Sequence, residues 1–101
     1  MIRHRVLVPP ELRDLFVHLP PAVKQKLHSS LRLLEENPLA GKALERELIG
    51  YRSYPIHPYR IVYRVEASRR LIQLVMVAPR REVYDLLSEH LQAHKPKPVR
   101  A

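Results

Sequence analysis

The chain has 101 residues, of which 46% are apolar, and carries a formal net charge of +8 at neutral pH. This composition predicts one small folded domain with a single core and excludes a wholly disordered chain. No stretch reaches the roughly 18 apolar residues of a membrane-spanning helix, and cysteine is absent. We therefore expect a cytoplasmic protein with no secretory signal, no membrane contact and no disulfide.

The first third of the chain carries one strand signal and two helix signals. Residues 2–8 alternate apolar and polar side chains and are rich in β-branched residues, which predicts a strand. Apolar residues recur at helical spacing over 11–19 and again over 21–36, with a Pro-Pro break between them. Asn37-Pro38 ends the second helix. The two segments predict a helical hairpin whose apolar stripes need a sheet to cover them.

The remainder of the chain supplies that sheet. After a loop over 38–50, three strands are predicted, at residues 51–56, 59–66 and 70–78. Pro55 cannot donate a ladder hydrogen bond, so its strand should lie at an edge. The continuous apolar run of the last strand implies burial on both faces, with the amino-terminal strand beside it. A final helix begins near Glu82.

The expected fold class is therefore α+β, in the order β-α-α-β-β-β-α. We expect a two-helix hairpin packed on a four-stranded, mostly antiparallel sheet, with the helices on one face. Residues 1–94 should form a single domain, and 95–101 a flexible basic tail.

Arginine is concentrated in the predicted sheet. All five lysines lie outside residues 43–94, whereas residues 48–81 contain a single acid, Glu66. The arginines of this stretch are Arg52, Arg60, Arg64, Arg69, Arg70, Arg80 and Arg81. A guanidinium binds phosphate through two parallel hydrogen bonds and stacks on bases. This distribution favours a polyanionic partner, either nucleic acid or an acidic protein segment, over a general preference for arginine.

Strand alternation separates aromatic from basic residues in the segment "YRIVYRV". Tyr59 and Tyr63 fall on one face, where we expect core packing, and Arg60 and Arg64 fall on the other. Arg64 is a candidate substrate-binding residue, with pairing to Glu66 or exposure to solvent as the alternatives.

Two residues of the preceding strand are expected on the same face as these arginines. Arg52 joins Arg60 there if the turn pairs the strands in the expected register. Tyr54 is assigned to the arginine side, where its ring can stack on a base.

Arg80 and Arg81 precede the last helix, where exposed cations are unfavourable by about 0.3–1 kcal/mol each. Glu82 and Asp85 suit the helix dipole, so the arginines depart from an otherwise consistent design. We predict a functional role for Arg80. For Arg81, pairing with Asp85 competes with substrate binding. Tyr84, in the same segment, is a candidate proton carrier or stacking residue.

Three motifs resemble the RelE/ParE superfamily of bacterial and archaeal toxins. They are "LIGYR", "YRIVY" and "RREVY", in this order and on the expected elements, and "LPPAVKQKL" and "NPLAGKALE" extend the similarity over nearly the whole chain. The resemblance implies either a RelE-type endoribonuclease that cuts messenger RNA, often on the ribosome, or a ParE-type inhibitor of DNA gyrase without catalysis. It also implies an acidic cognate antitoxin, while a catalytically inactive nucleic-acid-binding relative is a third alternative.

The resemblance assigns the catalytic positions motif by motif to Arg52, Arg60, Arg80 and Tyr84. Such residues suit RNA cleavage, in which charge develops on phosphate oxygens as the 2′-hydroxyl attacks. The sequence departs from the family at the turn, where His57 is either a proton carrier near the substrate or an exposed turn residue.

Metal and cofactor sites are not expected. His90 and His94 are spaced four apart on the last helix, but no third ligand accompanies them. The chain has two glycines and no phosphate-binding loop.

Overall fold

The computed structural model describes residues 3–93 of the chain. These residues form three α-helices, five strands and two short 3-10 turns. In chain order they are β1 (Arg5–Leu7), α1 (Pro10–Val17), α2 (Pro21–Glu36), β2 (Lys42–Ala43), η1 (Arg46–Leu48), β3 (Arg52–Ile56), β4 (Tyr59–Glu66), η2 (Ala67–Arg69), β5 (Leu71–Pro79) and α3 (Val83–Ala93). The α+β class and the order of the predicted elements are confirmed. The predicted tail at 95–101 lies outside the described residues.

The strands form one sheet in the order β1-β5-β4-β3-β2. β1 lies beside β5, as predicted, and runs parallel to it, whereas the other neighbouring pairs are antiparallel. The sheet has five strands rather than four because Lys42 and Ala43, expected in a loop, pair with Ser53 and Arg52. Two residues are too few to show a strand period. β2 leaves the Pro55 end of β3 at an open edge, where proline is tolerated.

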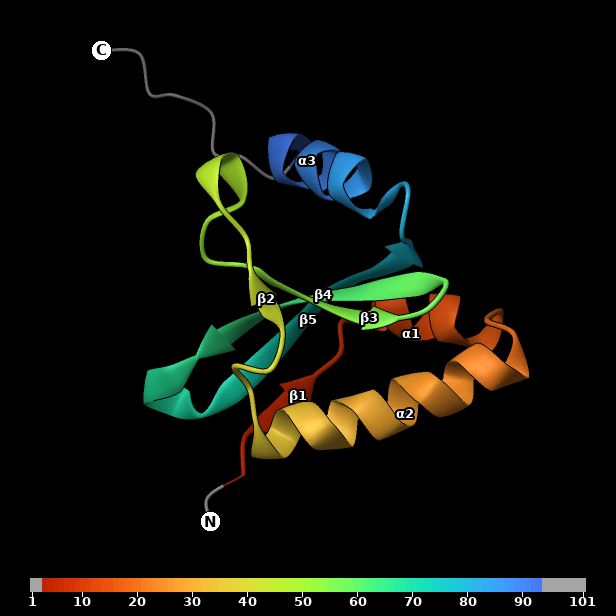
Figure 1. Cartoon of the computed structure of the whole chain (residues 1–101), viewed down its shortest axis with the longest axis horizontal. Coiled ribbons are helices and arrows are strands. Elements are labelled where there is room, and N and C mark those ends of the chain that lie inside the picture. Colours follow the sequence, from red (N-terminus) through yellow and green to blue (C-terminus); the bar gives the residue numbers. More distant parts are fainter. Residues whose placement is uncertain (1–2, 94–101) are drawn as a thin grey trace.

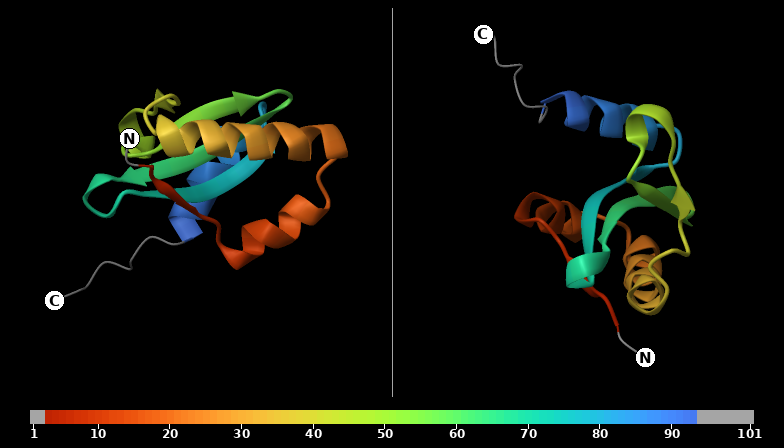
Figure 2. Two further views of the ribbon diagram at one scale, coloured as in Figure 1. Left: turned by 90° about the horizontal axis from the view of Figure 1, so that it is seen from below. Right: turned by 90° about the vertical axis from the view of Figure 1, so that its left-hand side faces the viewer.

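The sheet is the middle of three layers. Figure 1 and the right-hand view of Figure 2 show α1 and α2 on one side of it and α3 on the other. The expectation that the helices share one face is therefore wrong for α3. We call the two sides the hairpin face, covered by α1 and α2, and the α3 face. An apolar stripe defines which side of a helix is buried, but not which sheet face it meets.

The hairpin face holds the larger core. Its buried residues are Leu12, Val23, Leu27, Leu34, Ile56, Ile61, Tyr63, Ile72, Leu74 and Val77. Half-buried Tyr54 and Tyr59 pack against them, so the predicted core role of Tyr59 and Tyr63 is confirmed. The helices begin at prolines in their first turns, and α2 ends at Asn37 as expected.

The α3 face holds a smaller core of Val62, Ala78, Val83 and Leu87. Leu44 and Leu48, from the segment between β2 and β3, pack against this cluster. In the described part of the chain, no helix is long and apolar enough to cross a membrane.

Tyr63 joins the loop after α2 to the sheet. Its hydroxyl donates to the carbonyl of Pro38 at 2.7 Å and accepts from the amide of Gly41 at 2.9 Å. Burial raises the pKa of this hydroxyl above its ordinary value of 10.0. A Cβ on Gly41 would lie 2.5 Å from the Tyr63 oxygen, so this close approach requires glycine.

Candidate functional site

Three polar side chains meet on the α3 face of the sheet. A guanidinium nitrogen of Arg60 donates to the hydroxyl oxygen of Ser53 at 3.2 Å, and the Tyr84 hydroxyl lies 3.4 Å from the same oxygen. Ser53 is only 1% exposed, whereas Arg60 and Tyr84 are half-buried. We call these residues the Ser53 cluster. Two of them, Arg60 and Tyr84, were predicted site residues.

The cluster is assembled by strand pairing and by the first turn of α3. Ser53 lies opposite Val62, and Pro55 lies opposite Arg60, so Ser53 and Arg60 occupy the same sheet face. Val83 is buried in the α3-face core and places the following Tyr84 against the sheet. Ser53 was not among the predicted site residues. The available signal was a small polar residue inside a strand, at a position whose alternation matches Arg60.

Arg52 and Tyr54 lie on the opposite face from Arg60, so their predicted placement beside it is wrong. Arg52 pairs with Tyr63, and Tyr54 pairs with Ile61, both on the hairpin face. The Arg52 guanidinium donates to the carbonyls of Gly41 at 2.6 Å and Leu39 at 3.3 Å. In this position Arg52 holds the loop between α2 and β2.

Arg80 lies beside the turn between β3 and β4. Its backbone amide donates to the carbonyl of Pro58 at 2.9 Å, and its side chain is exposed. The turn is therefore close to both the end of β5 and the start of α3. Arg81 is also exposed and forms no ion pair with Asp85 within the part of the chain that the structure describes.

His57 is exposed at the same turn but faces α2. Lys26 donates to the carbonyl of His57 at 3.2 Å, and the His57 side chain lines a cleft with residues of α2 and β3. The structure thus brings His57 and Tyr54 together on the hairpin side, away from the Ser53 cluster.

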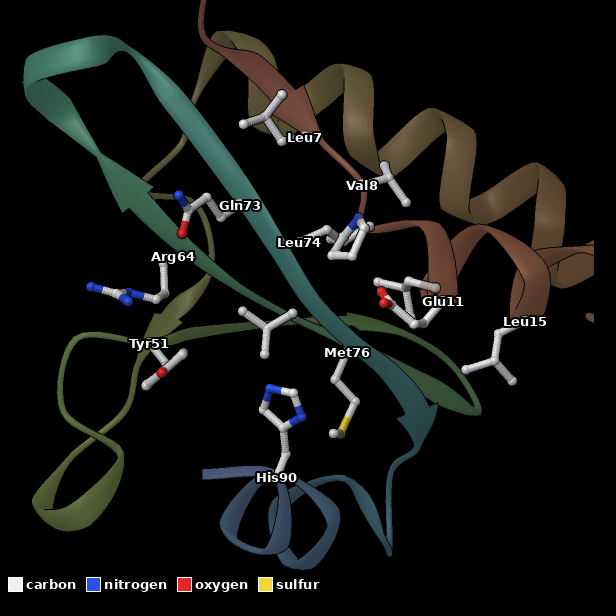
Figure 3. A pocket seen from close by; sticks show the side chains of 13 residues that line it. Leu7, Val8, Glu11, Leu15, Tyr51, Arg64, Gln73, Leu74, Met76 and His90 are labelled. Carbon is white, nitrogen blue, oxygen red and sulfur yellow. The ribbon is translucent and has the colours of Figure 1, made fainter. Parts of the chain in front are cut away.

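Arg64 lies at the other end of β4. Its guanidinium carbon is 5.4 Å from the centre of the Tyr51 ring, a cation–π arrangement. Figure 3 shows Arg64 and Tyr51 at one side of a hollow of about 750 Å³ that extends past Met76 and His90 towards α1. The alternative partner Glu66 instead contacts Arg69 at 3.5 Å. Arg64 is exposed and lies four residues further along β4 than Arg60.

The charges of this region suit an anionic ligand. Arg60, Arg80 and Arg81 lie around the start of α3, where the helix dipole also favours anions. Residues 3–93 contain no group of three side chains able to hold a metal ion. His94, the second residue of the rejected histidine pair, lies outside the described part.

Comparisons with known proteins identify the family. Residues 10–84 match the family model described as the ParE toxin of type II toxin-antitoxin system, parDE. Among curated proteins, no significant sequence match is found.

Solved structures with the same fold come from bacteria and archaea. The toxin-antitoxin complex RelBE2 from Mycobacterium tuberculosis matches with a TM-score of 0.70 and 27% identity, over 78% of this chain and 100% of that one. The archaeal RelE-RelB complex from Pyrococcus horikoshii matches with a TM-score of 0.67 and 21% identity, over 79% and 97%. A double arginine-to-alanine mutant of the E. coli toxin RelE in the free state matches with a TM-score of 0.73 and 17% identity, over 91% and 98%. Together with the family model, which spans most of the folded domain, these similarities show that the chain belongs to the ParE toxin family of type II toxin-antitoxin systems, within the RelE/ParE superfamily.

Proposed function

We propose that this toxin is an endoribonuclease that cleaves messenger RNA, with the Ser53 cluster as its catalytic centre. The observation that carries the proposal is the contact of Arg60 and Tyr84 with one buried hydroxyl, that of Ser53. A fixed guanidinium and a phenol next to each other can bind one phosphate and move one proton.

The reaction is an internal transfer at phosphorus. The ribose 2′-oxygen forms a bond to phosphorus while its proton passes to water or to a group of the ribosome. The bond from phosphorus to the 5′-oxygen breaks, and that oxygen gains a proton. The products are a 2′,3′-cyclic phosphate and a free 5′-hydroxyl, so neither a metal nor a cofactor is needed to balance the step.

Each residue of the centre has a distinct role. Arg60 stabilises the negative charge that develops on the non-bridging oxygens. Tyr84 donates the proton to the leaving 5′-oxygen, and Ser53 positions both side chains through its hydroxyl. Arg80 and Arg81, exposed before α3, bind neighbouring phosphates of the RNA strand.

A cognate antitoxin is the expected protein partner. The similar solved structures include toxin-antitoxin complexes from Mycobacterium tuberculosis and E. coli. The net charge of +8 favours an acidic antitoxin that covers the arginines of the α3 face.

The proposal is tested with purified toxin, translating ribosomes and a defined messenger. Tyr84→Phe keeps the ring but removes the hydroxyl, so we expect cleavage to fall by about 10² or more if the phenol donates the proton. Tyr51→Phe, on the same sheet face next to Arg64, is the matched control and should cleave normally. Near-normal cleavage by Tyr84→Phe would instead assign its ring to base stacking.

Inhibition of DNA gyrase is the second candidate, because the matching family model is that of ParE. A supercoiling assay with purified gyrase separates the two activities. Cleaved DNA accumulating with intact messenger would support gyrase inhibition. RNA binding without either activity would identify a catalytically inactive relative.

A further inference from the structure

A second cleft lies on the hairpin side of the sheet, between the first half of α2 and the open edge of β3. It has a volume of about 530 Å³. Its polar lining consists of Gln25, Lys26, Ser29, Ser30, Tyr54 and His57. None of the described residues that line it is acidic, so the cleft offers one cation and several hydrogen-bond donors without a competing carboxylate.

The cleft is joined to the proposed catalytic centre through one turn. Lys26 donates to the carbonyl of His57, while the amide of Arg80 donates to the carbonyl of Pro58, the next residue. In Figures 1 and 2 this turn lies at the same end of the molecule as the start of α2 and the loop into α3. The cleft and Arg80 are therefore neighbours on either side of the β3–β4 turn.

Within residues 3–93, no strand covers the edge of β3 between the two sites. β2 pairs only with Arg52 and Ser53, and exposed Pro55 follows at the open edge. Successive residues of β3 serve opposite faces: Ser53 contacts Arg60, and Tyr54 lines the cleft. A flexible single strand held by Arg60 and Tyr84 can therefore cross this edge and reach the cleft.

We propose that the α2–β3 cleft is a subsite for a nucleotide of the RNA strand that flanks the cleaved bond. Lys26 binds the phosphate of that nucleotide, and the hydroxyls of Ser29, Ser30 and Tyr54 bind its phosphate and ribose oxygens. This inference rests on the proposed ribonuclease function. It makes Lys26, which lies outside the arginine-rich sheet, an RNA-binding residue. It also places Tyr54 and His57 in the RNA subsite rather than in the catalytic centre.

The test measures binding of non-cleavable RNA carrying 2′-O-methyl groups, by fluorescence anisotropy. Two lengths of this RNA are compared. A dinucleotide is long enough only for the Ser53 cluster, whereas a hexanucleotide can also reach the cleft. Lys26→Gln should weaken hexanucleotide binding about threefold to tenfold. It should also reduce the slope of the logarithm of the binding constant against the logarithm of the salt concentration by about 0.7, the contribution of one phosphate contact on a single strand. Dinucleotide binding should stay unchanged. Lys24→Gln, on the same helix but outside the cleft, is the control and should bind both RNAs as the unmodified protein does.

The outcomes distinguish this inference from the proposed function. If the unmodified toxin binds neither RNA, the cleft assignment is overturned, and the cleavage assay with translating ribosomes decides the proposed function separately. If RNA binds but Lys26→Gln and Lys24→Gln behave alike, only the cleft assignment is overturned. A polyglutamate peptide is the third probe. If Lys26→Gln weakens binding of this peptide but not of the RNA, the cleft binds an acidic protein segment and the RNA subsite is overturned.

Discussion

On the hairpin face, the polar groups of Tyr63 and Arg52 form bonds within the protein. The Tyr63 hydroxyl bonds with Pro38 and Gly41, and Arg52 bonds with the same loop. On the α3 face, Arg60 and Tyr84 both contact the Ser53 hydroxyl and retain further hydrogen-bonding capacity. The same alternating strand therefore contributes to stability on one face and provides chemical groups on the other.

The two faces also differ in the size of their cores. Ten buried residues form the hairpin-face cluster and four form the α3-face cluster, so most of the burial that stabilises the fold lies beneath α1 and α2. This difference predicts that substitutions in the buried hairpin-face cluster change stability, whereas substitutions in the Ser53 cluster change activity.

The largest effect is expected from Leu27→Ala. Leu27 is 1% exposed on α2, and truncation there should lower the free energy of unfolding by about 2–5 kcal/mol. Urea denaturation measures the change. Leu15→Ala, at a position 55% exposed on α1, should stay within about 0.5 kcal/mol of the unmodified protein. Equal losses in both variants would contradict the assignment of the core.

Arg60→Ala should lower the rate of RNA cleavage by about 10²- to 10³-fold, the effect of losing one donor to a developing oxyanion. The denaturation midpoint should stay close to that of the unmodified toxin, because Arg60 lies outside both cores. Arg69→Ala, in the turn after β4, removes the same charge away from the cluster and should leave cleavage unchanged. A folded Arg60→Ala variant with full activity would remove Arg60 from the site.

Arg52→Ala should show the opposite pattern to Arg60→Ala. It removes the hydrogen bonds from the guanidinium to the carbonyls of Leu39 and Gly41, so the free energy of unfolding should fall by about 1.5–3 kcal/mol. Cleavage per folded molecule should be nearly normal, since the side chain lies on the hairpin face. Loss of cleavage in a stable Arg52→Ala protein would restore the catalytic role that its motif position implies.

Tyr63→Phe should cost about 1–3 kcal/mol of stability, because the buried amide of Gly41 and the half-buried carbonyl of Pro38 lose their partner. The substitution should also change how stability depends on pH in the alkaline range. A raised pKa means that the folded state holds the phenolic proton more tightly than the unfolded state. The corresponding stability is fully present below pH 10 and is lost as the pH rises from there through the folded-state value. Denaturation curves of Tyr63→Phe should lack this loss, and identical alkaline curves for the two proteins would refute it.

Local patterns in the sequence determined the elements and the assignment of residues within each strand. Helical spacing and prolines predicted α1 and α2. Strand alternation predicted that Tyr59 and Tyr63 lie on one sheet face and Arg60 on the other. These relations depend only on neighbours along the chain, through the strand period of two and the helix period of 3.6. The three sequence motifs likewise indicated the superfamily before any contact was known.

Tertiary pairing decided which of these residues meet. Ile56 pairs with Tyr59 across the turn, so Arg52 lies opposite Tyr63, and a shift of one residue would have put it opposite Arg64 instead. Such a shift exchanges the faces of a whole strand, and the alternation within that strand is the same in either register. The position of α3 also depended on packing, because Val83 and Leu87 pack against Val62 and Ala78 on the α3 face of the sheet. The Ser53 cluster exists only because β3, β4 and α3 converge there, and no segment taken alone contains the information that brings them together.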